Sequence, residues 1–169
     1  MSQTTVSEFR ETFVQGQVSN PSIADNDSKI VDGTSIQQGW AVIKGSNQDD
    51  VTVPAAAFTQ TTIRGVAMQN PFQNEQALTT GINIYEDDQP IPVLKKGKIA
   101  VLLGGTVTEG GIAFFVHTTG GASTINTWRG DLDTDKASEV PARFDSDGVS
   151  GDIVLIRLDT GSALGSILT

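Results

Sequence analysis

The chain of 169 residues has no cysteine, a single histidine, few basic residues and no long apolar run. Without cysteine it has no disulfide framework, no thiolate nucleophile and no cysteine-ligated metal site. This composition suits synthesis in a reducing cytoplasm. No stretch approaches the roughly 18 apolar residues of a spanning helix. The first residues, Met1–Glu8, have neither a positive start nor an apolar stretch, so we expect no signal peptide.

Basic residues are outnumbered by acidic ones. The chain has 11 Lys and Arg against 20 Asp and Glu, which gives a net charge of −9. A nucleic-acid-binding protein needs cations to displace counterions from phosphates. We therefore expect no direct binding to nucleic acid or to an anionic membrane. The negative charge is interpreted as a means of keeping the protein soluble.

Short apolar segments alternate with polar turns along most of the chain. Hydrophobic residues make up 37% and charged residues 18%, and Gly, Ser, Thr, Asn, Asp and Gln fill the remainder. About nine strand candidates recur every ten residues or so, which is typical of a sandwich or barrel. They number nine if Ile91–Leu94 and Lys98–Leu103 form one bent strand, and the others are Trp40–Lys44, Val51–Val53, Thr62–Met68, Ile82–Tyr85, Ile112–His117, Thr124–Trp128, Ala142–Phe144 and Ile153–Leu158. The predicted fold class is all-β.

The chain divides by composition into two parts. Residues 1–36 are polar and weakly patterned, which predicts an extended N-terminal arm with one short strand near Ile30-Val31. Within this arm, Asp25–Ser28 is interpreted as a loop. Residues 37–169 are predicted to form a single β-sandwich domain. Ile91–Leu94 and Lys98–Leu103 are two strands or one bent strand, and Gly65 indicates a bulge or a close backbone approach.

Residues that could carry catalysis or bind metal are few. His117 ends an apolar strand, and no nucleophile-elbow motif accompanies it. Asp131–Asp135 spaces carboxylates as a calcium loop does, but Lys136 stands where the loop needs Gly. Asp145–Gly148 is likewise only a partial match. We therefore expect no catalytic residue, no metal, no cofactor and no enzymatic activity.

A series of short segments, in order, resembles the phage structural cement (capsid decoration) proteins over residues 39–158. The matching segments are Gly39–Gly45, Val53–Ala57, Ile63–Ala67, Tyr85–Asp88, Ile91–Ile99, Val107–Val116, Pro141–Phe144 and Ile153–Leu158. The resemblance implies a jelly-roll-like β-sandwich on the outer surface of the virion capsid, made in the host cytoplasm. It also implies that the protein bridges neighbouring major capsid protein subunits and stabilises the shell against the pressure of packed DNA. Its partners would be the major capsid protein and other copies of itself, as a dimer or trimer.

Seven residues are candidate capsid contacts: Phe9, Arg10, Phe13, Ile23, Trp40, Lys95 and Lys96. Phe9, Phe13 and Ile23 would be apolar anchors of an arm that becomes ordered on binding. Alternatively, these side chains cover the protein's own sandwich. Two other functions stay open: another virion component, such as a head-fibre base or tail-tube protein, and a carbohydrate-binding or sugar-cleaving β-sandwich.

Overall fold

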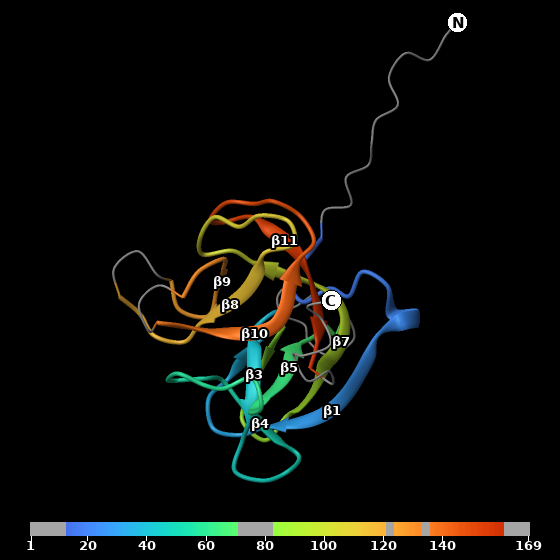
Figure 1. Ribbon diagram of the computed structural model, residues 1–169. Helices are drawn as coiled ribbons and strands as arrows, with labels where there is room; N and C mark the ends of the chain where they lie inside the picture. Colours follow the sequence, from blue (N-terminus) through green and yellow to red (C-terminus); the bar gives the residue numbers. More distant parts are fainter. Residues whose placement is uncertain (1–12, 71–82, 121–123, 133–135, 161–169) are drawn as a thin grey trace, which may run out of the picture.

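Strand β7 (Pro90–Leu102) is the longest strand and is shared by both halves of the sheet (Figure 1). The computed structural model describes residues 13–70, 83–120, 124–132 and 136–160. The two apolar segments on either side of Lys95–Gly97 form one continuous strand. Gly97 joins the two halves at a φ of 134°, a conformation that residues with a Cβ rarely adopt. β7 can therefore pass from one set of partner strands to another without interruption.

The first half of β7 closes a ring of five strands. β1 (Asp25–Val31) pairs antiparallel with β7 on one side and parallel with β4 (Asp50–Thr52) on the other. β3 (Ala41–Lys44) and β5 (Ile63–Ala67) complete the circuit from β4 back to β7 through antiparallel pairs. Because every strand of this ring has two neighbours, the ring presents no long free edge to other chains.

The second half of β7 starts a second set of strands. In order, these are β11 (Ile153–Asp159), β10 (Ala137–Phe144), β8 (Ile112–Val116) and β9 (Trp128–Arg129), each antiparallel to its neighbours. A bridge between Leu103 and Trp128 connects β9 back to the end of β7. The nine-stranded sheet therefore has two curved, nearly closed halves that have β7 in common.

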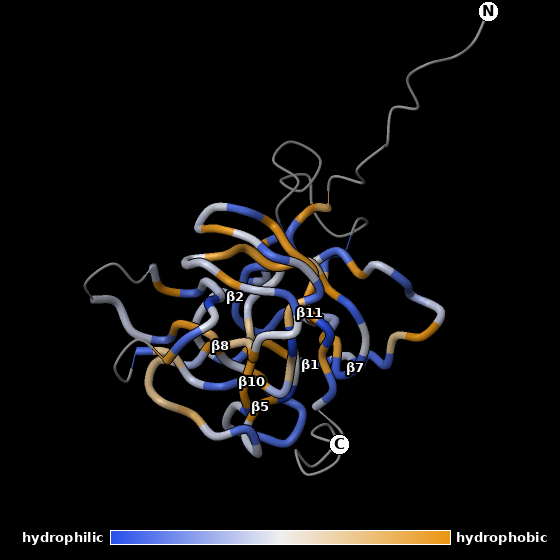
Figure 2. Tube along the Cα trace, turned by 45° about the horizontal axis from the view of Figure 1, so that its top comes forward, coloured by the Kyte–Doolittle hydropathy of each residue, from blue (hydrophilic) through white to orange (hydrophobic). Residues whose placement is uncertain are grey.

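Two large hydrophobic cores fill the two halves of the sheet, and Phe114, Val116 and Ala137 form a small third cluster among the described residues. Strand alternation divides neighbouring apolar residues between the two large cores. Ala67 of β5 belongs to the core of the first ring, whereas its neighbour Val66 belongs to the core of the second set. Val93 and Leu94 of β7 are divided in the same way. Trp40 packs against both cores. Figure 2 shows hydrophobic residues along β5, β8 and β10, in the body of the molecule.

Trp128 connects the second core to the segment that precedes β3. Its side chain is fully buried, and its indole Nε1 donates a hydrogen bond of 2.8 Å to the carbonyl oxygen of Gly39. Its ring meets that of Phe115 edge-on, with 5.2 Å between the ring centroids. A buried tryptophan with its N–H paired adds apolar contact area without leaving a donor unsatisfied.

Short elements complete the described part of the chain. β2 (Ile36–Gln37) and β6 (Ile84–Tyr85) pair antiparallel as a small second sheet. The single helical element among the described residues is the three-residue 3-10 turn η1 (Pro21–Ile23), which Asn20 caps. Within the described ranges, then, no helix has the length and apolarity to cross a membrane.

The all-β prediction is confirmed, and Gly65 does lie at a bulge with a close backbone approach. The loop interpretation of Asp25–Ser28 is wrong, because these polar residues pair in register with β7 as part of β1. Thr124–Thr127 is not a strand, since β9 starts only at Trp128. The jelly-roll topology and the division at residue 36 stay predictions.

Gly65 offers a direct test of how closely β5 and β7 approach. A Cβ at this position would lie 2.1 Å from the carbonyl oxygen of Leu94, and the φ of Gly65 is 147°. Steric overlap and backbone strain together should lower the free energy of unfolding of Gly65→Ala by about 3 kcal/mol. Gly151→Ala is the matched control, because Gly151 has a φ of 93° and open space around it.

Chemical denaturation of the two variants makes the comparison. The control should lose only about 1 kcal/mol, from backbone strain alone. Equal losses in the two variants would contradict the close approach of β5 to β7.

Candidate functional site

A face rich in basic side chains lies where the two halves of the sheet meet. We call it the basic face, and it comprises Arg64 of β5, Lys95, Lys96 and Lys98 of β7, Arg157 of β11 and Arg143 of β10. These six residues are more than half of the 11 Lys and Arg in a chain of net charge −9. Strand alternation turns Lys98 outward, because Ile99 beside it is fully buried.

Three of these cations stand side by side across neighbouring strands. Arg143 pairs in register with Arg157, and Arg157 pairs with Lys98. Like charges directly opposite one another destabilise a sheet. Asp145 offsets part of this repulsion, because its carboxylate accepts a hydrogen bond of 2.9 Å from Arg157 Nη2 and contacts Lys98 Nζ. Arg143 Nη1 instead donates to the carbonyl oxygen of Gly110, at 2.7 Å.

The two adjacent lysines of β7 are paired with acids on their own side of the sheet. Lys96 Nζ lies 3.6 Å from the carboxylate of Asp159. Lys95 Nζ lies 3.9 Å from carboxylate oxygens of both Asp25 and Asp27. The pKa of Asp27 is lowered mainly by a hydrogen bond from Lys29. Ion pairs at such exposed positions contribute little to stability, so these side chains remain free to exchange partners.

Two hollows open on this face, and Asp159 lines both. The first is a groove of about 370 Å³ beside β10, which Ile112, Val140 and Pro141 line together with Arg143 and Arg157. The second is a pocket of about 340 Å³, which we call the Arg64 pocket. Its lining residues are Asp25, Ile63, Arg64, Lys95, Lys96, Asp159 and Thr160.

Arg64 differs from the other charged side chains of its pocket in its hydrogen bonding. Its Nε atom is buried and has no hydrogen-bond partner among the described residues. A guanidinium group carries five donors, and a buried donor without an acceptor costs free energy.

His117 is the single histidine of the chain, for which the sequence predicts no catalytic role, and it is almost completely buried. Its Nδ1 lies 2.9 Å from Thr118 Oγ1, and the ring of Phe58 meets it edge-on at 6.1 Å. Burial lowers the pKa of His117, because the charged imidazolium is poorly solvated there.

In the Asp-rich segment 145–152, carboxylates cap backbone amides. Asp147 accepts from the N–H of Glu109 at 2.8 Å, and Asp152 from the N–H of Val149 at 2.9 Å. Asp133 and Asp135 lie outside the described residues. In the part of the chain that the structure describes, no three His, Cys, Asp or Glu side chains are grouped so that they could hold a metal ion.

The basic face thus combines charged side chains with apolar ones. The family model described as "Structural cement protein (E217 gp24/Pam3 gp6)", a phage family, matches residues 2–159. The chain belongs to this family. The fold of the cement protein also resembles a chain in the solved structure "The capsid of Myoviridae Phage XM1", with a TM-score of 0.67 and 16% sequence identity. That likeness covers 94% of this chain and 97% of the other. No curated protein matches the cement protein.

The structure places the predicted contact residues of the cement protein in different surroundings. Lys95 and Lys96 lie together in the Arg64 pocket. Ile23 is 63% exposed at the end of η1, whereas Phe13 and Trp40 are half-buried. Phe9 and Arg10 lie outside the described residues. Sequence analysis missed Arg64, Arg143 and Arg157, although the alternation of Arg157 with apolar residues of β11 could have placed it on an outer face.

His117 gives the cement protein a measurable pH dependence. Its pKa is lower in the folded state than its usual value of about 6.5 in an unfolded chain. Below that pH the unfolded state binds more protons than the folded state, so stability falls as pH falls. The contribution is complete above pH 6.5 and changes by at most about 1.4 kcal/mol per pH unit below it.

The variant His117→Gln serves as the reference, because Gln does not titrate. Denaturation of both proteins between pH 5 and pH 8 should show the wild type losing stability relative to the variant below about pH 6.5. A difference that stays constant over this range would show that His117 is equally easy to protonate in both states.

Proposed function

We propose that this cement protein binds the outer surface of an assembled phage capsid and bridges neighbouring major capsid protein subunits. The observation that carries the proposal is the family match over residues 2–159, a stretch that includes the whole described sheet. The fold likeness to a chain from a phage capsid structure supports the same conclusion. The protein acts as a structural component, and its partners are the capsid subunits and other copies of itself, as a dimer or trimer.

The physical role of such a protein follows from the load on the shell. Packed DNA pushes capsid subunits apart, so a molecule that binds two of them opposes separation with the free energy of each contact. A standard interface buries about 800 Å² per partner. Several moderate contacts made at once give high overall affinity through effective concentration. A body of two closely packed cores suits this role, because it loses little conformational entropy on docking.

Binding to shells that lack the protein tests this proposal. Purified protein added to such shells should co-sediment with them saturably, in many copies spread over the surface. Decorated, DNA-filled particles should then release their DNA at a higher temperature than undecorated ones. A few copies at one vertex, or an unchanged release temperature, would contradict the proposed role.

The N-terminal residues are a second part of the proposal. The sheet already includes the segment just before η1, because Gly16 N–H donates to Ala100 O at 2.7 Å and Ala100 N–H donates to Gln17 O at 2.9 Å. An arm that reaches a neighbouring subunit would therefore consist of residues 1–12, with Phe9 and Arg10 as contacts. Phe13 and the exposed Ile23 would extend that contact on the body of the protein.

Deletion of residues 2–12 separates the arm from the sheet. Loss of one buried phenylalanine contact, worth about 1.5–3 kcal/mol, should weaken binding to shells by at least about tenfold. The thermal unfolding temperature should stay unchanged, because the deletion leaves the pairing of Gly16 and Gln17 with β7 intact. Full binding by the deleted protein would remove the arm from the proposal.

A further inference from the structure

We propose that the Arg64 pocket binds a carboxylate side chain, Asp or Glu, of the capsid subunit on which the protein docks. This inference rests on the proposed function and names one contact of that docking surface. Four observations carry it: the local backbone around Arg64, the burial of its Nε atom, the pairing of the other charges in the pocket, and the composition of the pocket wall.

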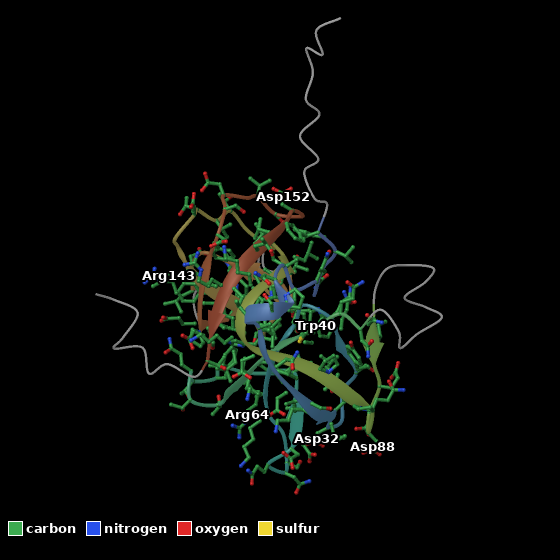
Figure 3. All side chains as sticks on the ribbon, turned by 90° about the vertical axis from the view of Figure 1, so that its right-hand side faces the viewer. Asp32, Trp40, Arg64, Asp88, Arg143 and Asp152 are labelled. Atoms are coloured by element: carbon green, nitrogen blue, oxygen red, sulfur yellow. The ribbon has the colours of Figure 1, made fainter. Side chains whose placement is uncertain are left out.

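The backbone at Arg64 is a β-bulge that alters the direction of this side chain. Val42 of β3 pairs with Gly65, and Ile43 pairs with Ile63, so Arg64 is an extra residue without a partner on β3. Bulges of this kind re-aim a side chain and are common beside functional sites. Gly65 makes the bulge possible, because its φ of 147° and its contact with Leu94 leave no room for a Cβ. In the view of Figure 3, Arg64 lies at the lower edge of the molecule and Arg143 at its left edge.

The charges around Arg64 are already assigned to other partners. Of the two acids that line the pocket, Asp25 lies within ion-pair distance of Lys95, and Asp159 of Lys96. Arg64 forms no ion pair with any acid in the described part of the chain, and its buried Nε lacks an acceptor there. The pocket therefore holds three cations and two acids, with the guanidinium of Arg64 as the unmatched charge.

A carboxylate is the ligand that this arrangement fits. It accepts two parallel hydrogen bonds from a guanidinium, and such a pair is shorter and stronger than a neutral hydrogen bond. A single negative charge would balance the pocket. A nucleic-acid strand fits poorly, because its successive phosphates would meet Asp25, Asp159 and a protein of net charge −9. Ile63 on the wall gives apolar contact for the methylene groups of an Asp or Glu side chain.

The energetics of the Arg64 pocket also suit a docking contact. Among the described residues the buried Nε has no acceptor, whereas in the complex it would gain one. An interaction that forms only on docking contributes fully to affinity. The same guanidinium would orient an acidic protein toward acidic groups of the capsid, which its net charge alone would repel.

The test compares three variants for binding to undecorated shells. Arg64→Gln removes the charge at similar length, Arg64→Lys keeps the charge but loses the planar fork, and Lys136→Gln is the charge-matched control outside both hollows. We expect Arg64→Gln to weaken binding by about thirtyfold or more, as truncation of a buried interfacial charge pair does. Arg64→Lys should recover only part of this loss, and Lys136→Gln should bind as the wild type does.

Two further readouts separate a binding role from a folding role. The thermal unfolding temperature of Arg64→Gln should equal or exceed that of the wild type, because the free protein loses a buried donor without an acceptor. Its binding should also depend less on salt than that of the wild type. If Arg64→Gln binds like the wild type, the pocket is not the docking contact, although the proposed function stands. If the wild type itself binds no shell, the proposed function fails and this inference fails with it.

Discussion

The fold depends on the pairing of one strand, β7, with two different sets of partners. Its first half hydrogen-bonds to β1 and β5, and its second half to β11. Neither half of the sheet can close without it. Its apolar side chains belong to two cores: Ile91 and Val93 to one, and Leu94, Ile99 and Val101 to the other. Closure removes free strand edges, which protects the protein from edge-to-edge aggregation.

The basic face follows from this arrangement. At the point where β7 changes partners, its outward residues Lys95, Lys96 and Lys98 meet Arg157 of β11 and Arg64 of β5, so cations from three strands gather in one region. Placing like charges side by side costs free energy in the isolated protein. A surface that retains them, with Arg64 Nε unsatisfied among the described residues, is better explained by a partner than by stability.

Strands with a clear pattern in a few consecutive residues could be predicted from the sequence. Strands that form only by pairing with a distant strand could not. The two apolar halves of β7 and the Gly65 bulge were predicted, because alternation and an interior glycine are visible in a few residues. β1 was missed at Asp25–Ser28, since its polar residues gain their strand conformation only from the distant β7. β10 was predicted only from the residues after Pro141. A proline inside a strand weakens the sequence signal, and the pairing of β10 with β8 shifts register in the same region. Lys95 and Lys96 were found by charge, but Arg64 becomes distinctive only once the bulge and the pocket are known.

Zero-length carbodiimide cross-linking of decorated shells is the most direct test that the basic face around β7 docks on the capsid. The reagent joins a lysine amine to a carboxylate only where the two are already in contact. Mass spectrometry should find links from Lys95 or Lys96 to acidic residues of the major capsid protein. Links to the capsid that come only from lysines outside the basic face, such as Lys136, with Lys95 and Lys96 unlinked, would contradict this account.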